Sequence, residues 1–438
     1  MWWGQAVHFA SKSDVGFSRQ NNQDSLAVQI CSDEAAWSNH GHLFLVADGM
    51  GGHAVGELAS KIAADTIPHT FFKSTDENIA DSLKKAIEQA NANINERGTQ
   101  NRDFERMGTT CTALVLSGQG AIIGHVGDSR LYRIRERRID QLTFDHSLQW
   151  ELIRQGKIKP HEIDQHEPRN VITRSLGPEP TVQVDLEGPY PIAPGDVYLL
   201  CSDGLTGHLS DQEIGMIANA LPPTDACRAL VNLANLRGGS DNITVVIVKI
   251  GEHSQASPAP RSQTMGDSTP GMNWRWLAGF WAAAILFVLG ISTMLFNKPL
   301  IGGTMTVLSV AAAVYLVYAW RKRNPKPRPV PETGDDTVLW RPYRTADARL
   351  TRGFLNHLVT IHDELQHVAN QENWSIEWSD HEQEHRHASI ALNAGEFQEA
   401  MIRFLKAIDL LMAGLLANRE HARHQRQWGK NNVPNQQK

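Results

Sequence analysis

Four aspartates stand at the ends of apolar segments, three of them beside glycine. They are Asp48 after LFLVA, Asp128 after AIIGHVG, Asp203 after DVYLLCS and Asp241 before NITVVIVKI. A carboxylate at the end of a buried strand is costly unless a cation meets it. Several short carboxylates that converge are the ligands that Mg²⁺ and Mn²⁺ prefer in proteins. The pattern predicts a divalent metal site, although a single Asp-Gly pair is more typical of a turn.

Two further polar residues lie upstream, in the segment SDVGFSRQNNQDS. Arg19 offers a planar fork of donors that suits phosphate oxygens. Asp24 adds a carboxylate that reaches the metals directly or through water. The glycines beside the aspartates expose backbone carbonyls and leave room for a phosphate group. The chemistry that these residues favour is therefore metal-assisted hydrolysis of a phosphate ester.

The elements that must position these residues lie in the first 250 residues. Short apolar runs there alternate with helical stretches at 56–66 and 78–95. In the second half of this region one predicted strand follows another across tight connections, which favours antiparallel pairing over a repeated βαβ plan. We therefore expect one α+β domain over residues 1–250.

Composition narrows the class of protein. The chain has 438 residues and a net charge of −6, which argues against broad nucleic-acid binding because that needs a basic face. The four cysteines show no C-x-x-C pairing. They are predicted to be small core residues in a reducing compartment rather than a disulfide frame or zinc site.

Residues 11–250 resemble the metal-dependent protein phosphatases of the PP2C type (PPM family) in their bacterial form. The matching stretches are SDVGFSRQNNQDS, LVADGMGGHAVGELAS, MGTTCTALVL, GHVGDSRLYRI, LTFDHSL, RNVITRSLG, YLLCSDGLTGHLSDQEI and GGSDNITVVIVKI. They cover the region in family order. The resemblance implies a central antiparallel β-sandwich flanked by helices, with a metal site at one end and a flap over residues 145–177.

The resemblance also implies roles for individual residues. Asp48 would bridge two Mg²⁺ or Mn²⁺ ions, and Gly49 would give one of them a backbone carbonyl. Asp203 and Asp241 would complete the other ion's ligands. Asp128, with Asp203, would hold a third ion, Asp24 would support the site through water, and Arg19 would bind the substrate phosphate. A water between the ions would attack phosphorus without a phospho-enzyme.

The sequence departs from the family pattern at two positions. Gln23 stands where many members have glutamate, and Met50 stands where eukaryotic members have a histidine regarded as the general acid. His53 lies nearby. It either donates a proton to the leaving group or caps the glycine loop, and the sequence favours neither role.

Two uncharged segments follow a polar linker at 251–272. Residues 276–296 and 300–320 each have about the 20 residues that a membrane-spanning helix needs. RKRNPKPR follows the second segment directly, whereas the turn between them carries only Lys298. The excess of basic residues predicts a transmembrane hairpin over 273–320 with both chain ends in the cytoplasm of a bacterium, and thus a multi-pass protein of the inner membrane.

The remaining residues form a predicted Pro-rich linker at 321–348, a small all-α region at 349–425 and a disordered tail at 426–438. The segment SIALNAGEFQEAMIRFLKAIDLL resembles one tetratricopeptide-like hairpin. One copy does not bury both its faces. This region is therefore predicted to bind a protein partner or to self-associate.

Two short motifs suggest other chemistry. GMGGHA at 49–54 matches a dinucleotide-binding fingerprint, but no second βα unit ends in an acidic residue at the expected distance. HEQEH, from His381 to His385, matches the helix of zinc peptidases, but it lies in a charged helical region without an evident cleft. Neither motif has the context that its function requires.

The predicted function is therefore a protein serine/threonine phosphatase anchored at the cytoplasmic face of the membrane. Its expected substrates are phosphorylated proteins, including serine/threonine kinases. The alternative is a catalytically weak or silent membrane scaffold that binds phosphoproteins. Such a scaffold is expected to lack metal-binding aspartates, whereas all of them are present here.

Overall fold

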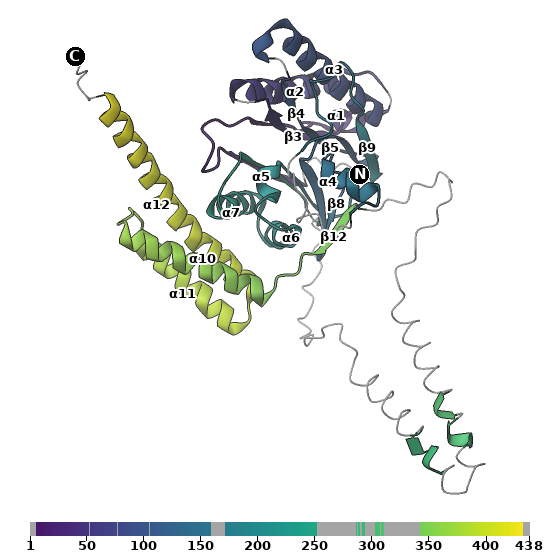
Figure 1. Ribbon diagram of the computed structural model, residues 1–438, viewed down its shortest axis with the longest axis vertical. Coiled ribbons are helices and arrows are strands. Elements are labelled where there is room, and N and C mark those ends of the chain that lie inside the picture. Colours follow the sequence, from purple (N-terminus) through teal and green to yellow (C-terminus); the bar gives the residue numbers. More distant parts are fainter. Residues whose placement is uncertain are drawn as a thin grey trace. The chain divides into compact units, whose positions relative to one another are not determined.

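The computed structural model describes residues 6–51, 53–76, 78–104, 106–158, 171–251 and 342–431, with short stretches between 286 and 310. The chain divides into two compact units. One comprises Met1–Ser254 with Trp340–Lys438, and the other is Gln255–Leu339. All the candidate site residues lie in the first unit, which is the part shown with labelled sheets and helices in Figure 1.

Two antiparallel sheets form the centre of this unit. The first has the strand order β1-β11-β10-β7-β8-β12, and the second has the order β2-β3-β5-β6-β9, with β4 paired to β3. The strands are β1 Val7–Asp14, β2 Asp24–Gln29, β3 His42–Met50, β4 Gly108–Thr109, β5 Cys111–Ser117, β6 Gly120–Val126, β7 Arg130–Arg135, β8 Arg138–Gln141, β9 Asp185–Tyr190, β10 Val197–Cys201, β11 Ile243–Ile250 and β12 Arg344–Asp347. The predicted antiparallel arrangement is confirmed.

Alternating side chains place the core between the sheets. Along β10, Tyr198 and Leu200 belong to the same buried cluster as Phe44 of β3, so they face the second sheet. Leu199, between them, belongs to a different cluster on the outer face of the first sheet. This period of two follows from the pleat of a strand. Both faces of the strand are buried, which explains its unbroken apolar sequence.

Helices cover the two outer faces. The pair α2 (His53–Lys73) and α3 (Ile79–Gln100) packs on the second sheet. The pair α6 (Asp211–Ala220) and α7 (Pro223–Leu236) packs on the first. The shorter helices are α1 Glu34–Asn39, η1 Arg102–Phe104, α4 Leu148–Arg154 and α5 Asp203–Thr206. The sandwich flanked by helices that the sequence predicts is therefore present.

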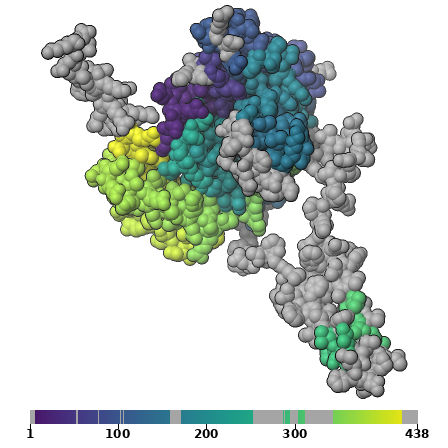
Figure 2. Space-filling model, viewed as in Figure 1, coloured from purple at the N-terminus to yellow at the C-terminus, as the bar shows by residue number. Residues whose placement is uncertain are grey.

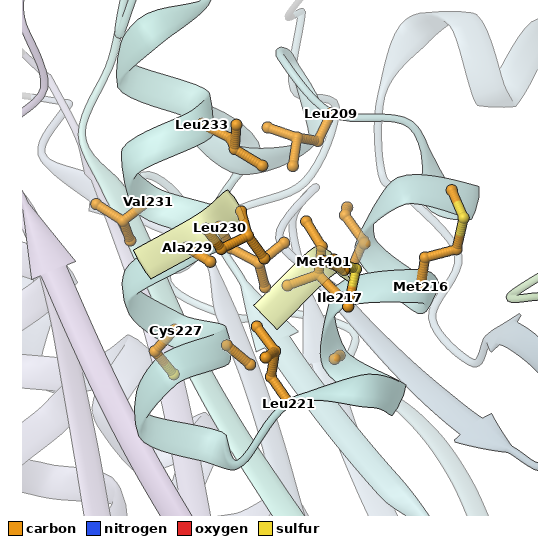
Figure 3. Close-up of a cluster of buried hydrophobic side chains, with 14 of the residues drawn as sticks. Leu209, Met216, Ile217, Leu221, Cys227, Ala229, Leu230, Val231, Leu233 and Met401 are labelled. Atoms are coloured by element: carbon orange, nitrogen blue, oxygen red, sulfur yellow. The ribbon is translucent and has the colours of Figure 1, made fainter. Parts of the chain in front are cut away.

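Three C-terminal helices extend the buried cluster on the outer side of α6 and α7, with α12 packed directly on α7 and the other two packed on α12. They are α10 Arg352–Gln371, α11 Trp378–Ala394 and α12 Phe397–Asn431. Met401 of α12 lies among Ile217 of α6 and Leu230 of α7 in one buried cluster (Figure 3). Asp409 of α12 accepts a salt bridge of 2.8 Å from Nε of Arg228. In the space-filling view the green and yellow helices lie directly against the teal surface (Figure 2).

The helical region agrees with its sequence pattern in part. Gly395, in the predicted break NAGEF, ends α11 with a φ of 79°. Glycine adopts this left-handed conformation without the penalty of a Cβ atom. Helix α12 continues to Asn431, beyond the boundary at 425 that the sequence predicts. The segment predicted as a linker ends in strand β12, which joins the edge of the first sheet beside β8.

Residues 276–296 and 300–320, the predicted membrane spans, lie mostly outside the described residues. Among the helices that the structure does describe, none has the length and apolar character needed to cross a bilayer. The four cysteines are free and buried, as predicted for small core residues.

Candidate metal centre

The predicted site residues come from both sheets. Asp24 is the first residue of β2 and stands opposite Asp48 of β3 in the antiparallel register. Asp203 begins α5 directly after β10, and Asp241 lies just before β11. Since β10 and β11 pair along their length, these two ends meet. Asp128 lies in the connection between β6 and β7.

The aspartates converge, since Asp24 stands opposite Asp48 and the other three line one cavity, and they therefore influence one another's ionisation. Burial raises the pKa of Asp48 well above its usual value, and the charges of four other aspartates raise it further; these are Asp24, Asp203, Asp128 and Asp241. Burial also raises the pKa of Asp128, as does the charge of Asp203. All five predicted carboxylates therefore lie in one place.

Two of these pKa values fall in the physiological range. Burial raises the pKa of Asp24 to about 7, against hydrogen bonds from Thr244 and Ser202 that lower it. Burial raises the pKa of Asp203 to about 6, with a further rise from the charge of Asp241. Without a cation, the folded protein therefore holds these protons more tightly than an exposed aspartate would.

The site offers oxygen atoms that the described protein groups leave unpaired. Oδ1 of Asp24, of Asp128 and of Asp203 is buried without a hydrogen-bond partner in the described part of the chain. The second oxygen of Asp24 accepts a hydrogen bond of 2.8 Å from Ser202 Oγ. Buried oxygens without partners are costly, and a hard divalent cation would satisfy them. The residues present fit Mg²⁺ or Mn²⁺.

Gly49 is required by the close approach of helix α2. A Cβ atom at this position would lie 2.1 Å from the carbonyl oxygen of Gly56. The Gly49 amide also donates a hydrogen bond of 3.1 Å to the carbonyl of Gln23, on the segment leading into β2. The glycine thus lets the end of β3, with Asp48, fit against α2. Its role as a carbonyl ligand stays a prediction.

Arg19 contacts the aspartates but is not buried with them. Its Nη2 donates to Oδ2 of Asp241 at 2.7 Å, and its side chain is 48% exposed. The loop before it is fixed by backbone bonds from Phe17 and Ser18 to the carbonyl of Gly239, at 2.8 and 3.1 Å. The guanidinium therefore stands at the rim of the site, within reach of both the carboxylates and the solvent.

The first residue of α2 is His53. Its side chain lies outside the described residues, so both roles considered for it stay predictions. Met50 ends β3 and is partly exposed.

Sequence reasoning missed a buried charged network beside the metal centre. Arg130 Nη2 and Asp145 Oδ2 form a salt bridge of 2.7 Å, with 14% and 5% of the two side chains exposed. Tyr132 donates a hydrogen bond of 2.8 Å to Asp211. The arginine follows Asp128 by two residues, so its place in GDSRLY was the available signal. The network surrounds one side of the centre with fixed charges.

A second missed residue is Asn242. Its side-chain amide donates to the carbonyls of Val15 and Asn21, at 2.9 and 3.0 Å, and its Oδ1 accepts from the amide of Gln23 at 2.8 Å. Asn242 thereby ties the loop that carries Arg19 to the start of β11, next to Asp241. No sequence pattern indicates that an asparagine here bridges two distant segments.

The HEQEH motif has another explanation in the structure. His381 is buried in the helical region, and its Nε2 lies 2.9 Å from Nε2 of His362. Glu382, which would be the general base in a peptidase, is exposed. His362, Asp363 and His385 lie near enough to offer ligands to one ion. The motif itself makes an interhelical contact.

The raised carboxylate pKa values predict a pH dependence of stability. Their unfolded value is 3.8, and the folded values of Asp24 and Asp203 are about 7 and 6. As pH rises through this window, the unfolded state loses protons that the folded state retains, so the stability of metal-free protein falls. We expect EDTA-treated protein to melt several degrees lower at pH 7.5 than at pH 5.

Manganese should oppose this fall, since metals bind deprotonated ligands. We expect Mn²⁺ to raise the melting temperature more at pH 7.5 than at pH 5, as measured by differential scanning calorimetry. Asp24→Asn, which removes one of the titrating groups, should flatten the pH dependence of the metal-free protein. Identical pH profiles for both proteins, with a Mn²⁺ shift independent of pH, would contradict this account of the centre.

A family model described as protein phosphatase 2C matches residues 18–224. The chain is 36% identical over 244 residues to the protein phosphatase PhpP of Streptococcus pneumoniae, covering 55% of this chain and 96% of PhpP. The strand β12 and the helices α10–α12 lie beyond the residues that the family model matches.

Solved structures give the same relation. The serine/threonine phosphatase PstP/Ppp of Mycobacterium tuberculosis superposes with a TM-score of 0.50 and 33% identity, over 56% of this chain and 99% of that one. The serine/threonine phosphatase of S. agalactiae gives a TM-score of 0.50 and 35% identity, again over 56% of this chain and 99% of that chain.

Proposed function

The chain belongs to the protein phosphatase 2C family, and we propose on that basis that its aspartate cluster holds the Mg²⁺ or Mn²⁺ ions with which it hydrolyses phosphoserine and phosphothreonine in proteins. Members of the family are metal-dependent protein serine/threonine phosphatases, and this chain is one of them. The observation that carries the proposal is the convergence of the carboxylates. Asp24 stands opposite Asp48 in the sheet register, Asp128, Asp203 and Asp241 line one cavity, and Ser202, next to Asp203, bonds to Asp24.

In the proposed centre, Asp48 would hold two ions, because the other four aspartates all surround its carboxylate closely enough to act on its charge. Gly49 would offer its carbonyl to one ion, whereas Asp203 and Asp241 would complete the ligands of the other. Bound ions of this kind make a water acidic enough to attack phosphorus. Asp24 supports the metal-binding aspartates, and its own buried carboxylate accepts a hydrogen bond from Ser202. The oxygen ligands are thus already in place before a substrate binds.

Arg19 is proposed to bind the phosphate of the substrate. Its present partner, Asp241, is also a proposed metal ligand, so the guanidinium must turn from the carboxylate toward the phosphate. The exposure of both side chains, 48% and 34%, leaves room for that movement. His53 either protonates the leaving group or caps the glycine loop.

A third ion is proposed at Asp128 with Asp203. The charge of Asp203 raises the pKa of Asp128, and Oδ1 of each is buried without a described partner. The alternative function, a silent scaffold that binds phosphoproteins, would not need these carboxylates. Their retention, at the cost of burying like charges together, favours catalysis.

The test of the proposed activity is phosphate release from a phosphothreonine peptide. Purified full-length protein is assayed with Mn²⁺, with Mg²⁺ and after EDTA. We expect turnover with either ion and none after chelation. Binding of the phosphopeptide without phosphate release in Mn²⁺ would favour the scaffold instead.

We further propose that the chain is anchored in the cytoplasmic membrane of a bacterium by residues 273–320, with a phosphorylated protein, such as a serine/threonine kinase, as substrate at the inner face. The support is the sequence: two uncharged segments, each about as long as a bilayer is thick, and a basic cluster directly after the second. Free thiols at all four cysteines suit the reducing cytoplasm.

Topology reporters test the anchor. Because both spans cross once, reporters fused after Gly251 and after Lys438 should both report the cytoplasm, whereas one inserted at Lys298 should report the outside. Replacing Arg321, Lys322 and Arg323 with glutamine should weaken this orientation, since those residues follow the second span directly. Terminal reporters on opposite sides of the membrane would show that one segment does not span it.

A further inference from the structure

Strand β12 carries residues from outside the matched family region to the edge of the catalytic sheet. It pairs antiparallel with β8, from Arg344 opposite Gln141 to Asp347 opposite Arg138. Thr345 Oγ1 donates to Asp140 Oδ1 at 2.8 Å. Backbone bonds of 2.9 and 2.8 Å continue the pairing on both sides, at residues 343 and 348. The position of β12 is therefore fixed by the sheet.

This strand lines the same cavity as the aspartate cluster. The cavity has a volume of about 600 Å³, and its lining includes Asp128, Asp203 and Asp241 as well as Arg344. A phosphoprotein segment whose phosphate reaches Asp128, Asp203 and Asp241 through this cavity occupies a space that Arg344 also borders. None of the residues of β12 lies within the part matched by the family model, residues 18–224.

The two arginines that line this cavity differ in their availability to a ligand. Arg130 is 14% exposed and donates three hydrogen bonds of 2.7–3.1 Å to Asp145. Arg344 is 41% exposed, and its Nε lies 3.5 Å from Oδ2 of Asp211. Within the described residues, the structure records no hydrogen bond from its guanidinium. Arg130 thus uses its donors within the protein, whereas Arg344 has guanidinium N–H donors available to a ligand.

The guanidinium of Arg344 is held beside the cavity by an aromatic group. Its Cζ lies 5.9 Å from the ring centroid of Trp150, an attractive cation–π distance. Trp150 is itself fixed edge-on against Phe144, with ring centroids 5.2 Å apart. Tyr343, the residue before Arg344, packs on the same Phe144 ring at 5.5 Å. The cation is therefore positioned before a substrate binds.

We propose that Arg344 and Trp150 form a subsite for a second anionic group of the substrate, beside the centre that hydrolyses the phosphate. The ligand is a carboxylate or a second phosphate on a residue that flanks the phosphorylated serine or threonine. A guanidinium fork matches both groups with charge-assisted hydrogen bonds. Because the guanidinium of Arg344 attracts an anion and repels a cation, this subsite selects anionic over basic flanking residues. The proposal rests on the proposed phosphatase function.

The test uses matched phosphothreonine peptides with the full-length protein and Mn²⁺. At one flanking position at a time, the peptide carries glutamate, glutamine, lysine or phosphoserine, and kcat/KM is measured. We expect glutamate or phosphoserine to exceed glutamine by about tenfold at one or more positions, as for one hydrogen bond to a charged group. Preference for phosphoserine alone would identify a phosphate ligand, and preference for both would identify a general anion site.

Variants of Arg344 assign the preference to this residue. Arg344→Gln should abolish the ratio of glutamate to glutamine peptides, and Arg344→Glu should reverse it in favour of lysine. A purely structural role for Arg344 would lower all rates together and leave the ratios unchanged. Arg349→Ala is the matched control, because Arg349 follows β12 but pairs with Asp347 away from the cavity.

These measurements distinguish failure of the proposed phosphatase function from failure of the proposed anion subsite. If no peptide releases phosphate in Mn²⁺, the proposed function itself fails. If all peptides are hydrolysed but the ratios are the same in wild type and Arg344→Glu, the phosphatase function stands and the anion subsite is overturned. Should Arg344→Glu fail to fold, as judged by its melting temperature, Arg344→Gln alone decides between these results.

Discussion

Asp48→Asn is expected to abolish turnover of phosphopeptides. The change retains the shape of the side chain but removes the charge at the middle of the carboxylate cluster, where we place a bridging metal ligand. Loss of even an outer partner of a metal ligand typically costs 10- to 100-fold in affinity or activity, so loss of the bridging ligand should exceed about a hundredfold. Phosphate release in saturating Mn²⁺ measures the effect.

A matched control distinguishes loss of a metal ligand from the general effect of removing one negative charge. Asp65→Asn makes the same substitution at an exposed position of α2, and should retain full activity. Folding is controlled by calorimetry. In the absence of metal, Asp48→Asn should melt no lower than wild type, because it removes a carboxylate whose pKa is raised by burial and by four like charges. Equal turnover in the two variants would contradict the assignment of Asp48.

Met401→Asp should destabilise the protein more than any other single change considered. Met401 of α12 is fully buried among side chains of α6 and α7 (Figure 3). The substitution removes that packing, which typically costs about 2–5 kcal/mol. It also places a carboxylate in an apolar cluster. Because whole domains are stable by only about 5–15 kcal/mol, we expect the C-terminal helices to detach or the unit to unfold at ordinary temperatures.

Hydrogen exchange of backbone amides shows which helices lose structure in Met401→Asp. Amides of α7 should lose protection in Met401→Asp, since the outer face of this helix is then exposed to water. The control is Ile390→Asp on α11, where the side chain is 67% exposed. This variant should match wild type in melting temperature and in α7 protection. If Met401→Asp also had the melting temperature and α7 protection of wild type, the C-terminal helices would not be packed on the catalytic sandwich in solution.

The metal centre could be predicted from sequence because its signal is local. Asp48 lies near the end of its own apolar strand, Asp128 and Asp203 each follow one, and a glycine needed for close packing stands next to Asp48. Asp24 was harder to place, since only the register of β2 against β3 sets it opposite Asp48. The sandwich itself followed from short apolar runs with tight connections.

The contribution of the C-terminal residues to the fold could not be predicted from sequence, and the reason is physical. Strand β12 has only four residues, RTAD, and its stability comes from pairing with β8, about 200 residues away in sequence. Similarly, a helical apolar period such as that of α12 shows that one face is buried but not what covers it. The sequence pattern therefore predicted binding to a protein partner or self-association, whereas in the structure α12 packs on α7 of the same chain.

The subsite at Arg344 shows the consequence of this nonlocal pairing. Nothing in the sequence near residue 344 resembles a binding motif, and the residue falls in a segment predicted to be an extended linker. Its relevance arises because β12 extends the sheet toward the cavity in which Asp128 and Asp203 lie. A substrate cleft formed by two distant parts of one chain is visible only once both parts are folded.

Anomalous X-ray diffraction from crystals of the protein soaked in Mn²⁺ would locate bound ions directly. We expect two strong manganese peaks in the aspartate cluster, with Asp48 oxygens within about 2.0–2.3 Å of the ions, and neither peak in crystals of Asp48→Asn. Manganese only at His362, Asp363 and His385, or no peak near Asp48, Asp203 and Asp241, would contradict the proposed metal centre.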